Sequence, residues 1–525
     1  MLKIIPKPNE IIESEGVFVF DEFCSFSYDE FSKDFCKKFE KQINSKKNKL
    51  SISTNNIKKI SFFTDYQIEN ECYKINCSAE ILNVFAGSKS GYFYAMQTLT
   101  QMLFKNNDEQ LCCPCVVISD KPAYSWRGFM LDEARHFFGE AEVKRLLDLM
   151  ALNKLNVFHW HLSDDQGFRV ESKKYPLLTA IGAKRSDTQV NGWRSNDYRC
   201  LEHKGFYTQA QIKDIVAYAK ERNIMVVPEI DMPGHFISIL ASYPNLSCTG
   251  VQMPVKVKFG ISKTIACAGN PNTYNFIYNL LDELCELFPA PYFHIGGDEA
   301  PKNEWETCPL CQKTIKDNNL KDEHQLQGFF TNKIATYLSA KGKKTICWND
   351  SLAENLHKDV IIQYWTVAKD KRVVEHLKAG RQFIISKSQY VYFDMPYAKI
   401  PLQKTYGFSP ELSEFAGLEQ YKNQILGGEG CLWTEWVYDR TKIDFNCFPR
   451  MCALSEACWT NKQSKNFSNF LQRTENIKQF LKPYKINFAS NKINNPKCHF
   501  NRAMACQKWF LKDQYFEVRN NKEEK

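Results

Sequence analysis

The sequence lacks several features that mark common non-enzymatic or nucleotide-binding proteins. Nowhere do 18 apolar residues follow one another, so we expect no transmembrane helix and no membrane insertion. The opening Met1-Leu-Lys-Ile-Ile-Pro-Lys-Pro has no long apolar stretch and no cleavage site. It therefore does not read as a signal peptide, which favours a cytoplasmic protein. No G-x-G-x-x-G follows a predicted strand, which argues against a doubly wound nucleotide-binding sheet.

A strong charge bias is also missing. The 525 residues carry 69 Lys and Arg against 60 Asp and Glu, a net charge of +9. More than half of this excess lies between Lys485 and the C-terminus. Such a small and localised excess indicates a solvated basic extension, and we expect no nucleic-acid partner.

Cysteine is abundant, with 20 residues. Without a signal peptide these residues predict reduced thiols. Cys308-Pro-Leu-Cys311 has metal-ligand spacing, and the run from Cys112 to Cys115 could supply partners. A second C-x-x-C at zinc-ribbon spacing is missing, so a structural zinc is the less favoured interpretation. We predict no metal and no cofactor.

The chain divides into three parts by pattern. Residues 1–122 mix short β-like runs with an amphipathic helix from Tyr92 to Leu103, and Pro114 and Pro122 bracket a last strand at Val116–Ile118. This pattern predicts a small α+β domain. Residues 123–480 alternate strands and helices, with one more helix after about Asn461. Residues 481–525 form the basic C-terminal extension.

Eight short β-branched or aromatic runs occur after Trp126, separated by amphipathic helices. The runs are Phe129–Asp132, Asn156–Leu162, Met225–Ile230, Tyr292–Ile295, Thr345–Trp348, Val360–Trp365, Phe383–Ser388 and Ile425–Trp433. Eight strands alternating with helices predict an α/β protein whose parallel sheet closes into a (β/α)8 TIM barrel.

Carboxylates follow several of these predicted strands. They include Asp132, Asp164, Asp231, Asp298, Glu299, Asp350, Asp394 and Glu435. Strand ends of such a barrel converge on one mouth, where gathered carboxylates repel each other and lose solvation. A fold that needed only stability would not concentrate them there, so the set predicts a catalytic mouth.

Asp298 and Glu299 are the sharpest candidates. Adjacent side chains of a regular strand point to opposite faces, so both can face one pocket only where the strand has ended. Gly296-Gly297 supplies that irregularity. A protonated carboxyl beside an ionised one suits acid–base catalysis. The alternative is a Gly-Gly turn before a helix whose acidic first turn suits the helix dipole.

Three tryptophans indicate the substrate class. Trp348, Trp365 and Trp433 lie at the ends of the fifth, sixth and eighth predicted strands. Together they suggest apolar walls around a sugar ring or an acyl group. Sugar hydroxyls would bind charged side chains, for which Arg127, Asp394 and Glu435 are the candidates.

Two other function classes stay open on these residues alone. His159-x-His161, with His235 and His294, is the pattern of a metal-dependent barrel hydrolase. That interpretation leaves the three tryptophans and Asp298-Glu299 unexplained. A sugar-binding protein that has lost catalysis would be expected to lack the acid, and Glu299 is present.

Five segments in order resemble the β-N-acetylhexosaminidases of glycoside hydrolase family 20. They are Trp126–Asp132, Asn153–Gln166, Pro228–His235, His294–Glu299 and Gly427–Glu435. The H-x-G-G-D-E motif followed by W-x-E is highly specific. The likeness covers about residues 1 to 460 and includes an N-terminal domain of family 20 type.

The resemblance implies a retaining exo-glycosidase without a metal or organic cofactor, acting on terminal β-linked N-acetylhexosamines of glycoconjugates or chitooligosaccharides. The substrate's own 2-acetamido oxygen would attack C1 and form an oxazolinium ion. Glu299 would protonate the glycosidic oxygen and then deprotonate water. Asp298 would hold the acetamido N–H, and Tyr392 would bind the acetamido oxygen.

The remaining implied roles concern binding. Trp348, Trp365 and Trp433 would enclose the acetamido methyl group; Arg127, Asp394 and Glu435 would bind hydroxyls; Asp164 and His235 would support the acid. Some relatives close a loop with a disulfide at the positions of Cys248 and Cys267. Many are lysosomal or secreted, which is the alternative to a cytoplasmic location, and a homodimer is the assembly we consider.

Overall fold

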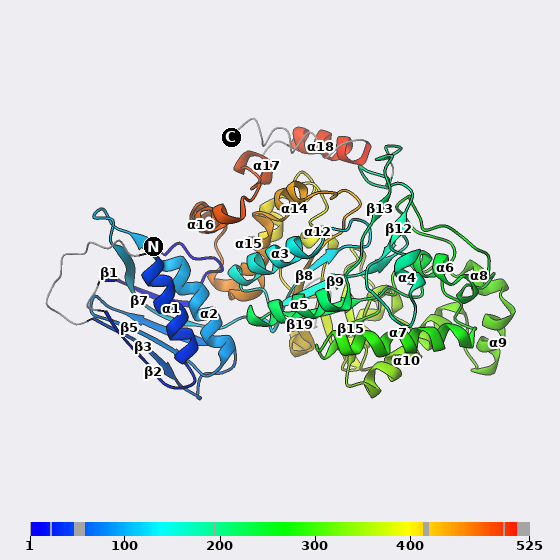
Figure 1. The fold of residues 1–525 in the computed structure, drawn as a ribbon, viewed down its shortest axis with the longest axis horizontal. Coiled ribbons are helices and arrows are strands. Elements are labelled where there is room, and N and C mark those ends of the chain that lie inside the picture. Colours follow the sequence, from blue (N-terminus) through cyan, green and yellow to red (C-terminus); the bar gives the residue numbers. More distant parts are fainter. Residues whose placement is uncertain are drawn as a thin grey trace. The chain divides into compact units, whose positions relative to one another are not determined.

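The computed structural model describes residues 2–21, 24–46, 58–193, 195–412, 419–496 and 499–511. The chain forms two compact units (Figure 1). The first contains Met1–Ser125, Asp148–Leu155 and Met451–Lys485. The second contains Trp126–Leu147, Asn156–Arg450 and Ile486–Lys525.

The first unit is built on a seven-stranded mixed sheet in the order β1-β7-β4-β5-β3-β2, with β6 beside β7. Its strands are β1 (Glu10–Val19), β2 (Cys24–Tyr28), β3 (Lys58–Thr64), β4 (Tyr73–Cys77), β5 (Ile81–Ala86), β6 (Phe104–Lys105) and β7 (Leu111–Asp120). Helices α1 (Lys33–Lys46) and α2 (Lys89–Met102) lie on the sheet. The predicted α+β domain is confirmed, although β7 runs through Pro114 instead of starting after it.

Helix α2 shows why the sequence folds this way. Ser88 caps it by accepting a hydrogen bond from the Gly91 amide. Tyr92 and Leu99 are fully buried in one core cluster with Phe18 and Ile75 from the sheet. The predicted amphipathic face thus packs on the strands.

The first unit also contains later segments of the chain. Helices α15 (Arg450–Trp459) and α16 (Phe467–Leu481) follow the barrel in sequence. Trp459 donates its indole N–H to Asp120 at 3.0 Å, and Lys154 Nζ lies 3.3 Å from the same carboxylate. Tyr73 donates its hydroxyl to Asp120 as well, at 2.5 Å. Three distant stretches of sequence therefore meet around one buried carboxylate.

The second unit is a closed eight-stranded barrel whose neighbouring strands pair in parallel. Its strands are β8 (Trp126–Asp132), β9 (Val157–His161), β14 (Met225–Glu229), β15 (Tyr292–His294), β16 (Lys344–Trp348), β17 (Ile361–Tyr364), β18 (Phe383–Ile385) and β19 (Ile425–Leu432). Each of the eight predicted runs contains one of them or lies within one, so the TIM-barrel prediction is confirmed.

Helices between these strands include α3 (Glu140–Leu152), α5 (Gln209–Glu221), α7 (Pro271–Leu287), α10 (Glu323–Ala340) and α11 (Arg372–Lys378), and α14 (Arg440–Cys447) follows β19. The capping box that Thr208 and Gln211 predict for α5 is present. Ile277, Leu280, Leu281 and Leu284 of α7 are buried, as the amphipathic pattern predicts.

Further short strands and helices lie in the connections and after the barrel. The strands among them are β10 (Ser163–Asp164), β11 (Gly167–Phe168), β12 (Lys184–Arg185) and β13 (His203–Lys204). The helices are α4 (Leu177–Ala180), α6 (Ile237–Ser242), α8 (Asn303–Thr307), α9 (Pro309–Asp317), α12 (Ser388–Val391) and α13 (Leu402–Tyr406). Short 3-10 helices are η1 (Pro244–Leu246), η2 (Asn349–Ser351), η3 (Glu419–Gln424), η4 (Lys462–Ser464) and η5 (Lys482–Tyr484).

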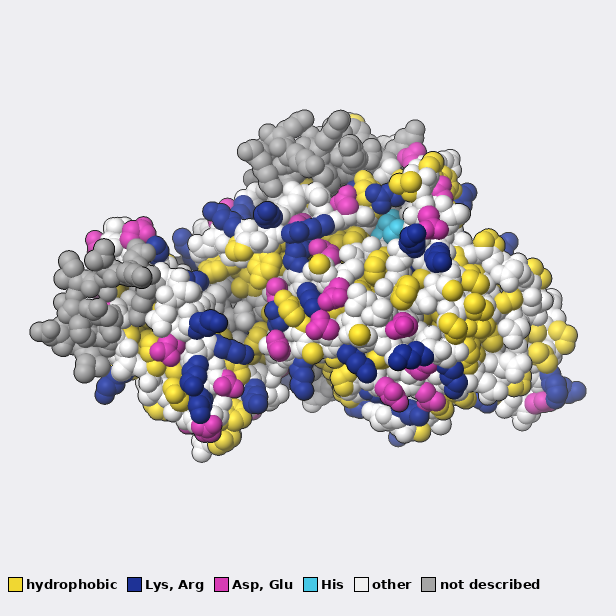
Figure 2. All heavy atoms as spheres, in the orientation of Figure 1, with side chains coloured by type: hydrophobic (Ala, Val, Ile, Leu, Met, Phe, Trp, Pro, Cys, Tyr) yellow, Lys and Arg dark blue, Asp and Glu magenta, His cyan; other side chains and the backbone are white. Residues whose placement is uncertain are grey.

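The C-terminal region contains more structure than one further helix. After α16 come α17 (Asn491–Asn494) and α18 (His499–Leu511). Positions 497–498 and 512–525 of the predicted basic extension lie outside the described residues. Over the face drawn in Figure 2, basic and acidic side chains are interspersed. Within the described part of the chain, no helix has the length and apolar character needed to cross a bilayer.

Candidate active site

The backbone breaks out of regular strand geometry immediately after β15. Gly296 and Gly297 have φ of 65° and 96°, and Glu299 has φ of 43°. A Cβ on Gly296 would lie 1.8 Å from Asp231 Oδ1, and one on Gly297 would lie 2.1 Å from Ser351 Oγ. Glycine is therefore required at both positions. The irregularity predicted from Gly296-Gly297 is present, and it frees the next two carboxyls from strand alternation.

Asp298 is buried, with 9% of its surface exposed. Its Oδ1 has no hydrogen-bond partner among the residues described. Burial, together with repulsion from the nearby Asp350 and Glu299, raises the pKa of Asp298 to about 7 although His235 opposes the rise. An unpaired buried acceptor of this kind is suited to a ligand N–H.

Glu299 lies at the end of a chain of charged groups. Its Oε2 is 3.5 Å from His235 Nε2, and its side chain is 37% exposed. His235 Nδ1 lies 3.1 Å from Asp164, which lies 2.8 Å from the Arg135 guanidinium. An Asp298 oxygen also lies within 4.8 Å of a His235 ring nitrogen. One imidazole therefore stands near both adjacent acids, and the predicted supporting pair Asp164–His235 is in contact.

The predicted aromatic residues gather around Tyr392. Trp365 stacks on Tyr392 with ring centroids 6.0 Å apart, and Trp433 lies 6.3 Å from Tyr392. Trp348 is 5.9 Å from Trp433 and fully buried. All four belong to one cluster, to which Met130 also contributes. Tyr392 is buried, which raises the pKa of its hydroxyl well above the usual value and keeps it a hydrogen-bond donor.

Polar contacts orient these rings. The Trp365 indole donates to Asp350 Oδ2 at 2.8 Å, and the Trp348 indole donates to Glu229 Oε1 at 2.8 Å. Burial raises the pKa of Asp350, which the Trp365 hydrogen bond partly offsets. Asp350 thus orients the Trp365 indole through a hydrogen bond and repels the carboxylates of Asp298 and Glu299.

Asp394 and Glu435 form an acidic pair. Burial raises the pKa of Asp394 well above its usual range, and the neighbouring Glu435 raises it further. Burial also raises the pKa of Glu435, which the Arg135 guanidinium opposes. Carboxyls with raised pKa values suit hydroxyl recognition, because the ionised form accepts hydrogen bonds and the protonated form can also donate one.

Arg127 does not lie at the carboxyl ends of the strands, where its predicted role in binding sugar hydroxyls would require it. It is the second residue of β8, pairs with Gly428 and is fully buried, with its amide bonded to Asn156. Asp132, at the other end of β8, is five residues further on, about 16 Å along a strand. The mouth lies at the carboxyl ends, so this placement argues against sugar contact by Arg127.

Arg135, beyond the carboxyl end of β8, lies next to the aromatic cluster instead. Its guanidinium lies 5.1 Å from the Trp433 ring centre and pairs with Asp132 and Asp164. The sequence signal was available, since Arg135 follows the strand end Asp132 by three residues. The sequence-based prediction assigned hydroxyl binding to Arg127 at the strand entry and gave Arg135 no role.

The His159-x-His161 pair lies in a buried charge network inside the barrel. His159 is 2.9 Å from Glu229 and 2.7 Å from Glu429, and His161 is 2.5 Å from Glu229. Burial opposes the charge of His159, but Glu429 and Glu229 raise its pKa to about 9. These imidazoles neutralise buried carboxylates, which is a structural role and disfavours the metal-dependent alternative.

Comparison with known families covers both units. The model of the glycosyl hydrolase family 20 catalytic domain matches residues 124–462. The model of domain 2 of the same family matches residues 1–121.

Individual relatives agree with this. A beta-hexosaminidase of Porphyromonas gingivalis is 34% identical over 93% of this chain, which spans 64% of that protein's length. One of Akkermansia muciniphila is 32% identical over 82% of this chain and 87% of its own. A solved GH20 exo beta-N-acetylglucosaminidase of Vibrio harveyi, in complex with N-acetylglucosamine, superposes with a TM-score of 0.80 at 31% identity, covering 93% of this chain and 78% of that one. With a catalytic-domain match over more than half of its length, the chain belongs to glycosyl hydrolase family 20.

Proposed function

We propose that this protein is a retaining exo-β-N-acetylhexosaminidase. It removes terminal β-linked N-acetylglucosamine or N-acetylgalactosamine from glycoconjugates or chitooligosaccharides. The observation that carries the proposal is the pair Asp298 and Glu299 beside one imidazole, next to the aromatic cluster of Trp348, Trp365, Tyr392 and Trp433.

The reaction proceeds in two steps on these residues. In the first, Glu299 protonates the glycosidic oxygen while the acetamido oxygen of the substrate attacks C1, and the aglycone leaves with the proton. Asp298 accepts a hydrogen bond from the acetamido N–H as its positive charge develops. In the second, Glu299 takes a proton from water, which opens the oxazolinium ion and restores the configuration at C1.

Other residues bind and orient the sugar. Tyr392 donates its hydroxyl to the acetamido oxygen, and Trp365, Trp433 and Trp348 enclose the acetamido methyl group. Asp394, Glu435 and Arg135 bind the ring hydroxyls through charge-assisted hydrogen bonds. Asp164 holds His235 against Glu299.

The decisive experiment removes the acid without changing its shape. Glu299→Gln should lower turnover of aryl β-N-acetylglucosaminides by at least about a thousandfold while the thermal unfolding transition is kept. Glu306→Gln, an exposed residue of α8, is the matched control and should keep wild-type turnover. Near-normal activity of Glu299→Gln would refute the assignment.

The acetamido nucleophile is tested separately. A panel of aryl glycosides with and without the 2-acetamido group should be cleaved only where the group is present. A thiazoline analogue of the oxazolinium should inhibit strongly. Hydrolysis of plain β-glucosides at a similar rate would contradict substrate assistance.

Three wider statements belong to the same proposal. The proposed domain division is 1–122, 123–480 and 481–525; the family matches over 1–121 and 124–462 support its first boundary, whereas contacts group residues 148–155 and 451–485 with the N-terminal unit. A cytoplasmic location is proposed, with a lysosomal or secreted one as the alternative. A homodimer is the proposed assembly, and light scattering on the purified chain would decide it.

A further inference from the structure

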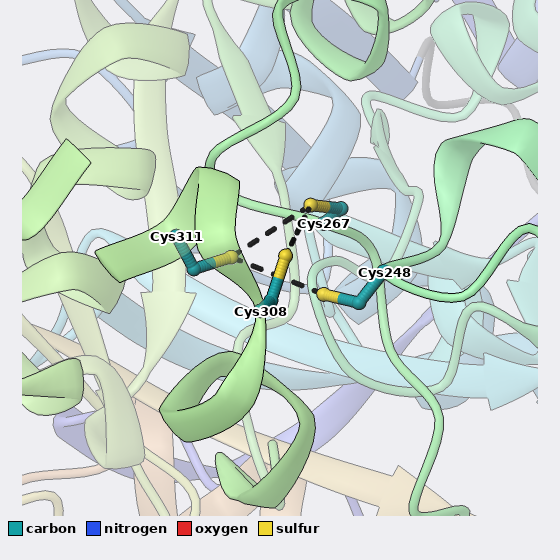
Figure 3. A group of neighbouring side chains, drawn as sticks. All are labelled: Cys248, Cys267, Cys308 and Cys311. Atoms are coloured by element: carbon teal, nitrogen blue, oxygen red, sulfur yellow. Dashed lines mark hydrogen bonds between the residues drawn. The ribbon is translucent and has the colours of Figure 1, made fainter. Parts of the chain in front are cut away.

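Four cysteine side chains converge outside the sugar site. Cys248 and Cys267 come from the loop between η1 and α7, and Cys308 and Cys311 come from the start of α9 (Figure 3). Their sulfur atoms all lie within 4.8 Å of one another. Cys267, Cys308 and Cys311 are buried, and Cys248 is partly exposed.

Three of the six sulfur separations match the edges of a tetrahedron around a metal ion, and the others are at most 4.8 Å. Cys267 Sγ lies 3.7 Å from Cys311 Sγ and 3.8 Å from Cys308 Sγ, and Cys248 Sγ lies 3.9 Å from Cys311 Sγ. A zinc ion with four Zn–S bonds of about 2.3 Å requires S···S edges of about 3.8 Å. A disulfide would require about 2.05 Å between two sulfurs. The observed spacing therefore fits shared coordination of one ion.

Backbone contacts bring the four residues together. An isolated β-bridge joins Ser247 to Ala266, which sets Cys248 beside Cys267. Cys308 is the N-cap of the nine-residue helix α9, and Cys311 lies in its first turn. Gly269 brings the loop against this turn, since a Cβ there would lie 2.3 Å from the Cys311 amide nitrogen. The arrangement is a C-x-x-C knuckle facing two loop cysteines.

We propose that Cys248, Cys267, Cys308 and Cys311 bind one zinc ion as a structural site. Four thiolates in tetrahedral spacing select zinc or iron, and zinc is the usual ion of closed four-cysteine sites. All four positions are filled by the protein, so no ligand position remains for a substrate. On binding, the thiols release their protons to solvent. This proposal is independent of the sugar chemistry above and departs from the sequence-based prediction of no metal.

The site links two loops that carry catalytic groups. Ala266, next to Cys267, donates its amide to Pro233, two residues before His235. The Trp305 indole, three residues before Cys308, donates to the Ala266 carbonyl at 3.0 Å. Trp305 follows Glu299 by six residues in sequence. The ion would thereby fix the loop of His235 to the segment that follows Glu299.

The first test measures metal in the intact protein. Wild-type chain purified under reducing conditions without a metal-affinity step should contain about one zinc per chain by plasma mass spectrometry. Chain produced with cobalt in place of zinc should show the intense visible absorption of tetrahedral cobalt bound to thiolates. A metal-free wild-type protein, an iron-containing one, or a Cys248–Cys267 disulfide in mass spectra would overturn the proposal.

Variants then locate the ion. Cys311→Ser and Cys248→Ser should each lower bound zinc at least severalfold and lower the melting temperature. Cys285→Ser, a partly exposed residue of α7 outside the cluster, is the matched control and should keep both values. Full zinc content in both cluster variants would place the metal elsewhere. Because the wild-type measurements need no variant, the proposal stays testable if a variant fails to fold.

Discussion

At the scale of single residues, the pKa of Asp298 predicts how activity depends on pH. The carboxylate must be ionised to accept the acetamido N–H, and burial raises its pKa to about 7. Since the ionised fraction grows as the pH rises through the pKa, kcat/KM should increase with pH up to about 7 and then level on this limb. A pH series of kcat/KM on an aryl β-N-acetylglucosaminide measures this.

The outcome that would contradict this assignment is a kcat/KM that is flat from about pH 5 to 8. Asp298→Asn provides the control. It should lower kcat/KM and remove the limb near pH 7, because an amide does not titrate. The same limb in Asp298→Asn would belong to another group.

Arg135 gives a second prediction at this scale. Its fork pairs with Asp164 and faces Trp433, so lysine would keep the charge and lose the planar contacts. With one or two charge-assisted hydrogen bonds lost, at about 1.5–3 kcal/mol each, Arg135→Lys should lower kcat/KM by roughly 10- to 100-fold or more. Arg440→Lys, half exposed on α14, is the control. Unchanged kinetics in Arg135→Lys would remove it from the site.

At the scale of elements, the turn after β15 is the part on which the site depends. Gly297→Ala would combine a φ of 96° with a Cβ 2.1 Å from Ser351 Oγ. Left-handed backbone costs about 1 kcal/mol or more for a non-glycine residue, and the clash adds to it. We expect a lower melting temperature together with a large loss of kcat.

Gly342→Ala is the control that introduces backbone strain without a steric clash. Gly342 also has a positive φ, 73°, but a Cβ there meets nothing within 4 Å. This variant should lose about 1 kcal/mol of unfolding free energy and keep its kcat. If Gly297→Ala behaved like Gly342→Ala, with full activity, the turn would not position the acids.

The elements themselves were largely predictable, because each barrel strand is a short buried run and several connecting helices begin with a capping residue. Thr208 and Gln211 predicted the start of α5, and the Gly296-Gly297 pair predicted the end of β15. Spatial pairing was harder. Cys248 and Cys267 are far from Cys308 in sequence. The four-sulfur cluster therefore becomes visible only when the loop is seen to fold onto α9. Arg127 and Arg135 are eight residues apart on one segment. Arg127 lies at the start of β8 and Arg135 follows its carboxyl end, so only Arg135 is at the end of the barrel where the site lies.

At the scale of the whole molecule, the first unit is assembled from segments far apart in sequence. Asp120 from β7 is bonded to Lys154 and to Trp459, all within this unit. Lys154→Met should lower the free energy of unfolding by about 3–5 kcal/mol, because it leaves a buried carboxylate without its cation. Chemical denaturation measures the change.

The double variant Lys154→Met/Asp120→Asn tests the cause. It should recover part of the loss, since the amide carries no charge to leave uncompensated. Strict additivity of the two single variants would mean that the pair does not interact. It follows that residues 1–122 expressed alone would lack two partners of Asp120 and should fold poorly.

The two proposed catalytic carboxyls are neighbours along the backbone, and this has a kinetic consequence. One trans peptide holds their Cα atoms about 3.8 Å apart, however the surrounding loops fluctuate. A displacement of this segment therefore moves the backbone of the proton donor and of the amide anchor together. Distant substitutions that disturb this stretch should lower hydrolysis of all substrates, and most for poor leaving groups, because these depend on protonation by the acid.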